Sequence, residues 1–271
     1  MRINNNIMAL NTHNSYVGNN SRLAKSAEKL SSGFRVNRAG DDAAGLAISE
    51  KMRGQIRGLN MAAKNSQDAV SLVQTAEGAL QETHSMLQRM RELSVQSASD
   101  TNETLDRAAL NAEFKALAAE IDDTSSKTKF NDTTLLDGTF TSKIIQTGAN
   151  MNDELSISIG KMDCATIGIA TTNDITNQAN AKASISACSN AINNVSTQRA
   201  ELGALQNRLE HKINNLTVSS ENLQAAESRI RDLDMAKEMT EFTKNNILSQ
   251  ASTAMLAQAN QNPQGVLSLL R

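Results

Sequence analysis

Apolar residues recur every three or four positions over most of this chain. The clearest run lies between residues 43 and 98, has no proline, and forms one stripe along a helix face. Its members are Ile48, Met52, Ile56, Leu59, Ala63, Val70, Val73, Leu80 and Leu87. A helix of this length would extend roughly 80 Å, so it must pack against other long helices. The pattern predicts a rod-like helical bundle.

A second long stripe begins at Ala181 and keeps a heptad-like spacing, which predicts a second long helix packed along the first. Its members are Ile185, Cys188, Ile192, Val195, Leu202, Leu205, Leu209, Ile213, Leu216, Leu223, Ile230 and Leu233. The expected fold class is therefore mainly α: a long antiparallel helical bundle, similar to a coiled-coil rod, with a small β-hairpin region.

The residues between the two stripes predict shorter elements. A helix is expected over about 102–126, with Asp100 and Glu103 as a capping box. Segments 140–147 and 153–160 predict a β-hairpin, because apolar residues alternate with serine in the second one. The polar stretch 161–180 predicts an irregular surface loop.

Both terminal segments predict weak helices. Asparagine is frequent near the N-terminus and has poor helix propensity, so this segment either docks on its own chain as a frayed end or becomes ordered only on assembly. Its apolar stripe contains Ile3, Ile7, Leu10 and Val17. The C-terminal segment is expected to place one stripe on a single face and to end at Pro263, before an apolar tail that includes Leu269. That stripe contains Met235, Met239, Phe242, Leu248, Ala251 and Met255.

Composition and scattered reactive residues argue against an enzyme. The 271 residues include no Trp and carry a net charge of −2, which gives no general attraction to nucleic acid or anionic membrane. The three histidines have no Cys, Asp or Glu at metal-ligand spacing, so no metal or cofactor is expected. No apolar run is long enough to cross a bilayer, and no secretory signal is visible.

Two cysteines and three glycines leave structural alternatives open. Cys188 lies on the second stripe and is expected to be buried, whereas Cys164 is expected to be accessible in the 161–180 loop, and a bridge between them stays possible. Gly54, Gly58 and Gly78 lie inside the first long helix, where they serve close helix approach or are simply tolerated.

Four stretches in order resemble the bacterial flagellin family. They are MRINNNIMAL (1–10), LSSGFRVNRAGDDAAGLAI (30–48), QRMRELSVQS (88–97) and NNILSQASTAMLAQANQNPQGVLSLL (245–270). The resemblance implies a filament subunit with an inner core from 1–42 and 235–271. Residues 43–234 would form a surrounding helical rod domain, with a short variable region at about 131–180. A flagellin-like hook-filament junction protein and a cytoplasmic helical adaptor are the alternatives.

The resemblance also implies location and partners. The chain would be exported without a cleaved signal peptide, with help from an export chaperone and the flagellar secretion apparatus, and would assemble under a filament cap as an extracellular homopolymer. The terminal stripes would drive this assembly. Arg89, Leu93 and Glu113 match the family's contact positions for Toll-like receptor 5.

Overall fold

The computed structural model describes residues 6–169 and 174–269, with side chains described as far as residue 262. The helices are α1 (Ile7–Ser32), α2 (Ala43–Ser97), α3 (Thr104–Lys127), α4 (Cys164–Ile167), α5 (Gln178–Arg231) and α6 (Met235–Leu269). The strands are β1 (Lys129–Phe130), β2 (Thr133–Thr134), β3 (Lys143–Gln146) and β4 (Glu154–Ile157). Two compact units divide inside α2 and α5: a terminal unit, Met1–Gly54 with Asn222–Arg271, and a central unit, Gln55–Glu221. The mainly α fold class is thus confirmed.

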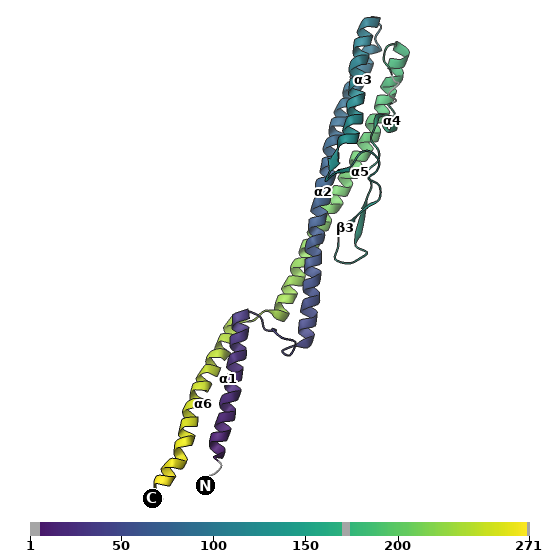
Figure 1. Ribbon diagram of the computed structural model, residues 1–271. Coiled ribbons are helices and arrows are strands. Elements are labelled where there is room, and N and C mark those ends of the chain that lie inside the picture. The colour runs from purple at the N-terminus through teal and green to yellow at the C-terminus, as the bar shows by residue number, and fades with distance from the viewer. Residues whose placement is uncertain (1–5, 170–173, 270–271) are drawn as a thin grey trace. The chain divides into compact units, whose positions relative to one another are not determined.

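In the central unit α2 and α5 run side by side (Figure 1), and each carries a heptad series of core residues. On α2, one series of buried residues follows alternating steps of four and three, and Leu72 and Leu93 are buried beside it. The series is Ala62, Ser66, Ala69, Val73, Ala76, Leu80, Thr83, Leu87, Met90, Ser94 and Ser97. On α5 they recur at Ala181, Cys188, Val195, Leu202, Leu209 and Leu216, with Ser184, Ala191 and Gln198 between them. Such spacing lets side chains interlock along two helices. The small residues on α2 permit close approach.

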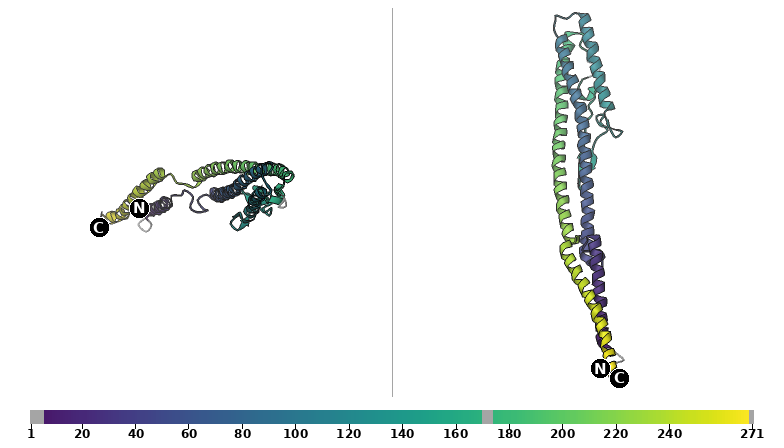
Figure 2. Two further views of the ribbon diagram at one scale, coloured as in Figure 1. Left: turned by 90° about the horizontal axis from the view of Figure 1, so that it is seen from above. Right: turned by 90° about the vertical axis from the view of Figure 1, so that its left-hand side faces the viewer.

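Polar contacts fix the antiparallel direction of these two helices. Near one end of the central unit, the Ser220 hydroxyl and the Asn60 side chain are 2.8 Å apart. Toward the other end, the Gln178 side chain donates to the Ala98 carbonyl at 3.3 Å. The helix α3 runs beside them in both views of the ribbon (Figure 2) and buries Phe114 and Ile121.

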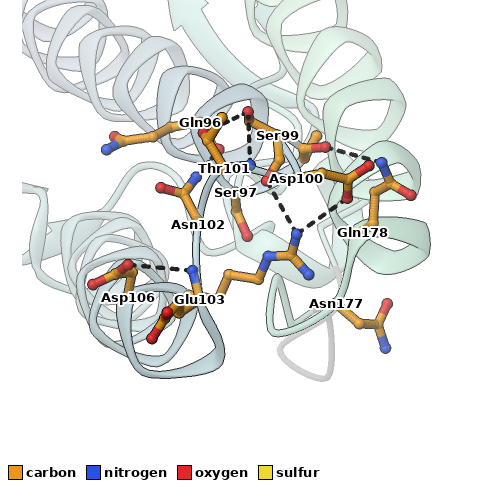
Figure 3. Close-up of polar contacts among 12 residues, drawn as sticks. Gln96, Ser97, Ser99, Asp100, Thr101, Asn102, Glu103, Asp106, Asn177 and Gln178 are labelled. Atoms are coloured by element: carbon orange, nitrogen blue, oxygen red, sulfur yellow. Dashed lines mark hydrogen bonds and ion pairs between the residues drawn. The ribbon is translucent and has the colours of Figure 1, made fainter.

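The turn that joins α2 to α3 contains a capping box, but the predicted pair of Asp100 and Glu103 is wrong (Figure 3). The box is formed by Glu103 and Asp106 instead, and the Asp106 carboxylate accepts from the Glu103 backbone N–H at 3.2 Å. Asp100 pairs with Arg107 at 3.5 Å, and Arg107 also donates to the Ser99 carbonyl at 3.0 Å. Asp100 therefore stabilises the turn through Arg107, and Glu103 is the residue that caps α3.

Two antiparallel hairpins follow α3. Strands β1 and β2 are joined by Asn131 and Asp132, whose φ angles of 47° and 61° fit the left-handed turn that matches strand twist. Strands β3 and β4 pair in register from Lys143 with Ile157 to Gln146 with Glu154, which confirms the predicted hairpin. The predicted alternation of apolar and polar residues is confirmed in β4, because Leu155 and Ile157 are buried while their neighbours are exposed.

Segment 161–180 is not an irregular surface loop. It contains the short helix α4, capped by the Asp163 side chain, and buries Ile167, Ile169 and Ile175 among its described residues. The Ile175 backbone N–H donates to the Asn111 side chain at 3.1 Å, and its carbonyl accepts from the Ser97 hydroxyl. Isolated isoleucines between polar residues thus anchor this segment to the helices.

Of Gly54, Gly58 and Gly78 in the interior of α2, only Gly58 has a close neighbour. A Cβ at Gly58 would lie 3.0 Å from the Ala149 Cβ, in the loop between β3 and β4, whereas one at Gly54 or Gly78 would meet nothing within 4 Å. The absence of a side chain at Gly58 therefore lets the loop of the β3–β4 hairpin, and not another helix, approach α2 closely. The other two are tolerated.

Replacing these glycines by alanine gives a matched pair. Gly78→Ala is expected to raise the free energy of unfolding by about 1 kcal/mol, because alanine favours the helix and the space is open. Gly58→Ala should gain clearly less, since the Ala149 loop must shift. Urea unfolding of both variants measures this difference. Equal gains would show that the hairpin loop does not pack against α2 at this point.

Candidate interaction surfaces

The terminal unit pairs α1 with α6 through a mainly polar seam. The Asn6 side chain donates to the Ala259 carbonyl at 2.7 Å, and the Asn19 side chain donates to the Ser252 hydroxyl at 3.2 Å. Most seam residues are only half-buried: Ala9, Thr12, Tyr16, Asn19 and Leu23 on α1, with Phe242, Asn245, Ser249, Ser252 and Leu256 on α6. The pair therefore has little apolar core of its own.

The predicted apolar stripe of α1 faces away from this seam. Ile7, Leu10 and Val17 are 62%, 63% and 51% exposed. At about 100° per residue they share one side of the helix, opposite Thr12, Tyr16 and Leu23. Ile3 lies outside the described residues. Among the described residues, the side chains of Ile7, Leu10 and Val17 are thus left largely uncovered.

The predicted single stripe of α6 is wrong, because its members lie on different sides. Met239 and Leu248 are nine residues apart, which places them about 180° apart around the helix. Phe242 faces α1, whereas Met235, Met239, Leu248 and Met255 are exposed. A helix with apolar residues on several sides is suited to being surrounded by protein. The side chain of Leu269 lies outside the described side chains.

A shallow apolar hollow lies on the outer side of α6. Its lining residues are Met239, Thr240, Thr243, Lys244, Ile247 and Leu248. The helix continues beyond it through Pro263 to Leu269, so the prediction that proline ends α6 is wrong. Proline removes one backbone hydrogen bond and bends a helix, and the turns on either side still form here.

The segment that joins α1 to α2 is held by polar and aromatic contacts to the end of α5. Gly33 takes the left-handed conformation that ends α1, with φ of 73°. The Arg231 guanidinium lies 4.8 Å from the centre of the Phe34 ring and pairs with Glu50 at 2.6 Å. This hydrogen bond lowers the pKa of the Glu50 carboxyl. Asp42 caps α2, as its position before the helix indicates, by accepting from the Gly45 N–H at 2.8 Å.

Two of the three residues that match the receptor-contact positions meet on the surface of the central unit. Arg89 of α2 donates to Glu113 of α3 at 2.9 Å and also pairs with Glu92 at 3.1 Å. Each of these side chains keeps nearly half or more of its surface exposed. The hydrogen bond to Glu113 is the main cause of a raised Arg89 pKa. The guanidinium is therefore held in place while still open to a partner.

The third residue, Leu93, is fully buried at 0% exposure in the core of the central unit. The Leu93 side chain therefore offers no surface to a partner, although its position matches a contact position of the family. Val95, which is 54% exposed, offers apolar surface on the same helix instead. It lines a shallow surface hollow with Gln88, Arg91, Glu92 and Gln96.

Both cysteines are free thiols buried in the central unit. The expectation for Cys188 is confirmed, and that for Cys164 is wrong because α4 turns its thiol inward. The Cys164 thiol donates to the Ala118 carbonyl at 3.2 Å, and burial raises its pKa to about 12. Burial also raises the pKa of Cys188. Both thiols are thus kept in their unreactive form.

This burial predicts slow thiol labelling. In native protein at neutral pH, both cysteines should react at least about tenfold more slowly than in urea, since the thiolate is the nucleophile. Stability of the central unit should also fall as pH rises from about 9 toward about 12, because the unfolded thiol ionises first. A Cys164→Ala variant should lose part of that pH slope. Fast native labelling of Cys164 would contradict its burial.

The described part of the chain offers little else for chemistry. Among the residues searched, no three His, Cys, Asp or Glu side chains gather in a way that could hold a metal ion. None of the described helices is long and apolar enough to cross a membrane. What the molecule does present is long helical surface with exposed apolar side chains, which is the property of a structural, self-associating helical protein.

Comparison with known proteins defines the family. The model of the bacterial flagellin N-terminal helical region matches residues 3–141, and that of the C-terminal helical region matches residues 185–270. The chain is 58% identical to a flagellin of Halalkalibacterium halodurans and 55% identical to a flagellin of Bacillus subtilis. Each alignment covers 100% of this chain and 100% of the relative. The chain belongs to the bacterial flagellin family. It is a structural protein and not an enzyme.

Solved structures agree with this assignment. The crystal structure of Bacillus cereus flagellin is 32% identical, with a TM-score of 0.53, and the match covers 60% of this chain and 94% of that one. A putative flagellar hook-associated protein from Vibrio parahaemolyticus has a TM-score of 0.61 over 71% of this chain, but at 13% identity it shares the fold alone. Membership of the flagellin family removes the helical adaptor alternative.

Proposed function

We propose that this chain is a subunit that polymerises into the extracellular bacterial flagellar filament, with α1 and α6 in the filament's inner core. The observation that carries the proposal is the outward position of Ile7, Leu10 and Val17 on α1 and of Met239 and Ile247 on α6. Large apolar side chains in water favour association, and burial between copies of the chain would cover them. Membership of the flagellin family supports the same reading.

Electron microscopy of the purified chain tests this proposal. After salt-induced polymerisation, the parent should form long homopolymeric tubes, and discrete oligomers would favour a junction protein. Deletion of 1–32 or of 244–271 should abolish the tubes while α2, α3 and α5 keep their helical circular dichroism. Tubes from either truncated chain would remove the assembly role from that end.

An export chaperone, the flagellar secretion apparatus and the filament cap complete the proposed partners. They follow from membership of the family, and the chain would reach the outside without a cleaved signal peptide. Secretion by a flagellated host whose secretion apparatus is intact, compared with one in which it is deleted, tests this route. Mass spectrometry of the secreted chain would then show whether its N-terminus is kept.

The exposed pair of Arg89 and Glu113 favours a second proposed role, recognition of the monomer by Toll-like receptor 5. Arg89 offers a planar set of donors that Glu92 and Glu113 hold from two helices. An arginine fixed in this way loses little freedom on binding, which is typical of interface hot spots. Leu93 would act from the core, by keeping α2 in position under Arg89.

A binding titration of the monomer against the receptor ectodomain tests this role. Arg89→Ala and Glu113→Ala should each weaken binding at least about tenfold, as expected for hot-spot residues. Lys127→Ala is the matched control, since Lys127 also forms an exposed ion pair, with Asp123, at another point of α3. Equal effects in all three variants would place the contact elsewhere, and no binding by the parent would remove the role.

A further inference from the structure

Exposed methionines lie on both helices of the terminal unit. Within the terminal unit, Met8, Met235, Met239 and Met255 are 64%, 49%, 49% and 60% exposed. None of these four belongs to the seam between α1 and α6. In the central unit, Met90 and Met162 are buried, and exposure is limited to Met61 and Met151 among the residues described there. These four side chains are thus open to small solutes in the monomer.

We propose that Met8, Met235, Met239 and Met255 form an oxidation site for a small two-electron oxidant of the hydrogen peroxide class, and that their sulfoxides block polymerisation. This inference rests on the proposed filament function, because it assigns a modification to the two helices that the proposed function places in the filament core. It makes assembly competence depend on the oxidation state of the monomer.

The chemistry requires only the thioether and peroxide. A sulfur lone pair attacks one peroxide oxygen, the O–O bond breaks, and an S–O bond forms. A proton moves from the transferred oxygen to the departing hydroxide, so the products are one methionine sulfoxide and one water. The sulfur loses two electrons and the peroxide gains them. Access of peroxide to the side chain is the main requirement, and the four exposed residues meet it.

The position of these methionines predicts which step the oxidation affects. The α1–α6 pair is held by contacts such as Asn6 with Ala259 and Asn19 with Ser252, which a sulfoxide on the outer sides leaves intact. The outward faces, however, change from apolar to polar. A sulfoxide oxygen that is buried between subunits without a donor opposes association. Folding is therefore expected to survive, and assembly to fail.

The hollow around Met239 has few donors to offer a sulfoxide. The Thr243 hydroxyl already donates to the Met239 carbonyl at 2.8 Å, and the Thr240 hydroxyl donates to the Lys237 carbonyl at 2.6 Å. Ile247 and Leu248 complete the apolar side of the hollow, and Lys244 is its one cationic side chain. A sulfoxide at Met239 would thus be poorly satisfied once this face is covered.

The experiment compares the parent with a variant in which all four methionines are leucine, which keeps the apolar volume. Both are treated as monomers with hydrogen peroxide, mapped by peptide mass spectrometry, and then polymerised. The treated parent should carry sulfoxides at the four positions, keep its helical circular dichroism, and need a critical concentration at least about tenfold higher. The treated leucine variant should polymerise like the untreated parent.

Three further comparisons make the result decisive. A Met61→Leu/Met151→Leu variant is the matched control and should lose assembly after peroxide as the parent does. A variant with the four methionines changed to glutamine should fail to assemble without peroxide. Preformed tubes should resist oxidation at the four positions.

Two outcomes would overturn the inference: equal loss of assembly by the leucine variant, or sulfoxide at all four positions with unchanged assembly. Failure of the proposed function itself looks different, since the untreated parent would then form no tubes. In that case, peptide mass spectrometry of the peroxide-treated monomer still tests whether the four methionines are oxidised. Oxidation at the four positions no faster than at buried Met90 would refute the site.

Discussion

The variant Leu209→Asp is expected to unfold the central unit well below the parent's melting temperature. Leu209 is 0% exposed and lies in the α5 seam, one heptad from Leu202 and from Leu216. An aspartate there must stay desolvated or take up a proton, and it also loses the leucine packing, so we expect a cost of about 4 kcal/mol. For a unit of this size, that corresponds to a fall in Tm of roughly 10 °C.

Thermal unfolding followed by circular dichroism measures this effect. Val218→Asp is the matched control, because Val218 lies on the same helix, is also apolar, and is 56% exposed. Its cost should stay within about 0.5 kcal/mol, as is usual for surface positions. A parental Tm for Leu209→Asp would mean that α5 packs on α2 through a different face.

The double variant Leu10→Asp/Ile247→Asp is expected to abolish tube formation at concentrations where the parent polymerises. These side chains are 63% and 60% exposed on α1 and α6, so the charges should leave the monomer's helical content unchanged. In a filament core both carboxylates would have to lose their water without a partner. A cost of about 4 kcal/mol would raise the critical concentration about a thousandfold.

Sedimentation after salt-induced polymerisation, with electron microscopy of the pellet, measures this effect. Val218→Asp serves again as the control, since it adds a comparable charge on the central unit, and it should polymerise close to the parental concentration. Parental tubes from the double variant would show that the outer faces of α1 and α6 are not buried between subunits.

The long helices could be predicted because their core repeats a simple chemical pattern. Val73, Leu80 and Leu87 are seven residues apart and are all buried, and Cys188, Val195 and Leu202 follow the same spacing on α5. The intervening buried serines, such as Ser66 and Ser94, carry no apolar signal and were missed. Their hydroxyls donate to backbone carbonyls four residues earlier, which makes them acceptable in a core.

Segment 161–180 could not be predicted because its structure depends on contacts with distant residues. A sequence window contains Cys164 and Ile175, but not the Ala118 carbonyl or the Asn111 side chain that hold them. The same limit applies to the candidate surfaces. Helical spacing indicated that Ile7 and Leu10 share a face, but not which face meets α6. It also could not show that Leu93 lies beneath Arg89 rather than beside it.

The polar seam of the terminal unit has a thermal consequence. Among its described residues, buried apolar side chains are limited to Val36 and Ala259, so most of the apolar surface of α1 and α6 stays hydrated in the monomer. Covering hydrated apolar surface lowers the heat capacity, and near room temperature the driving force is mainly the entropy of released water. Association through these helices should therefore strengthen on moderate warming and weaken on cooling.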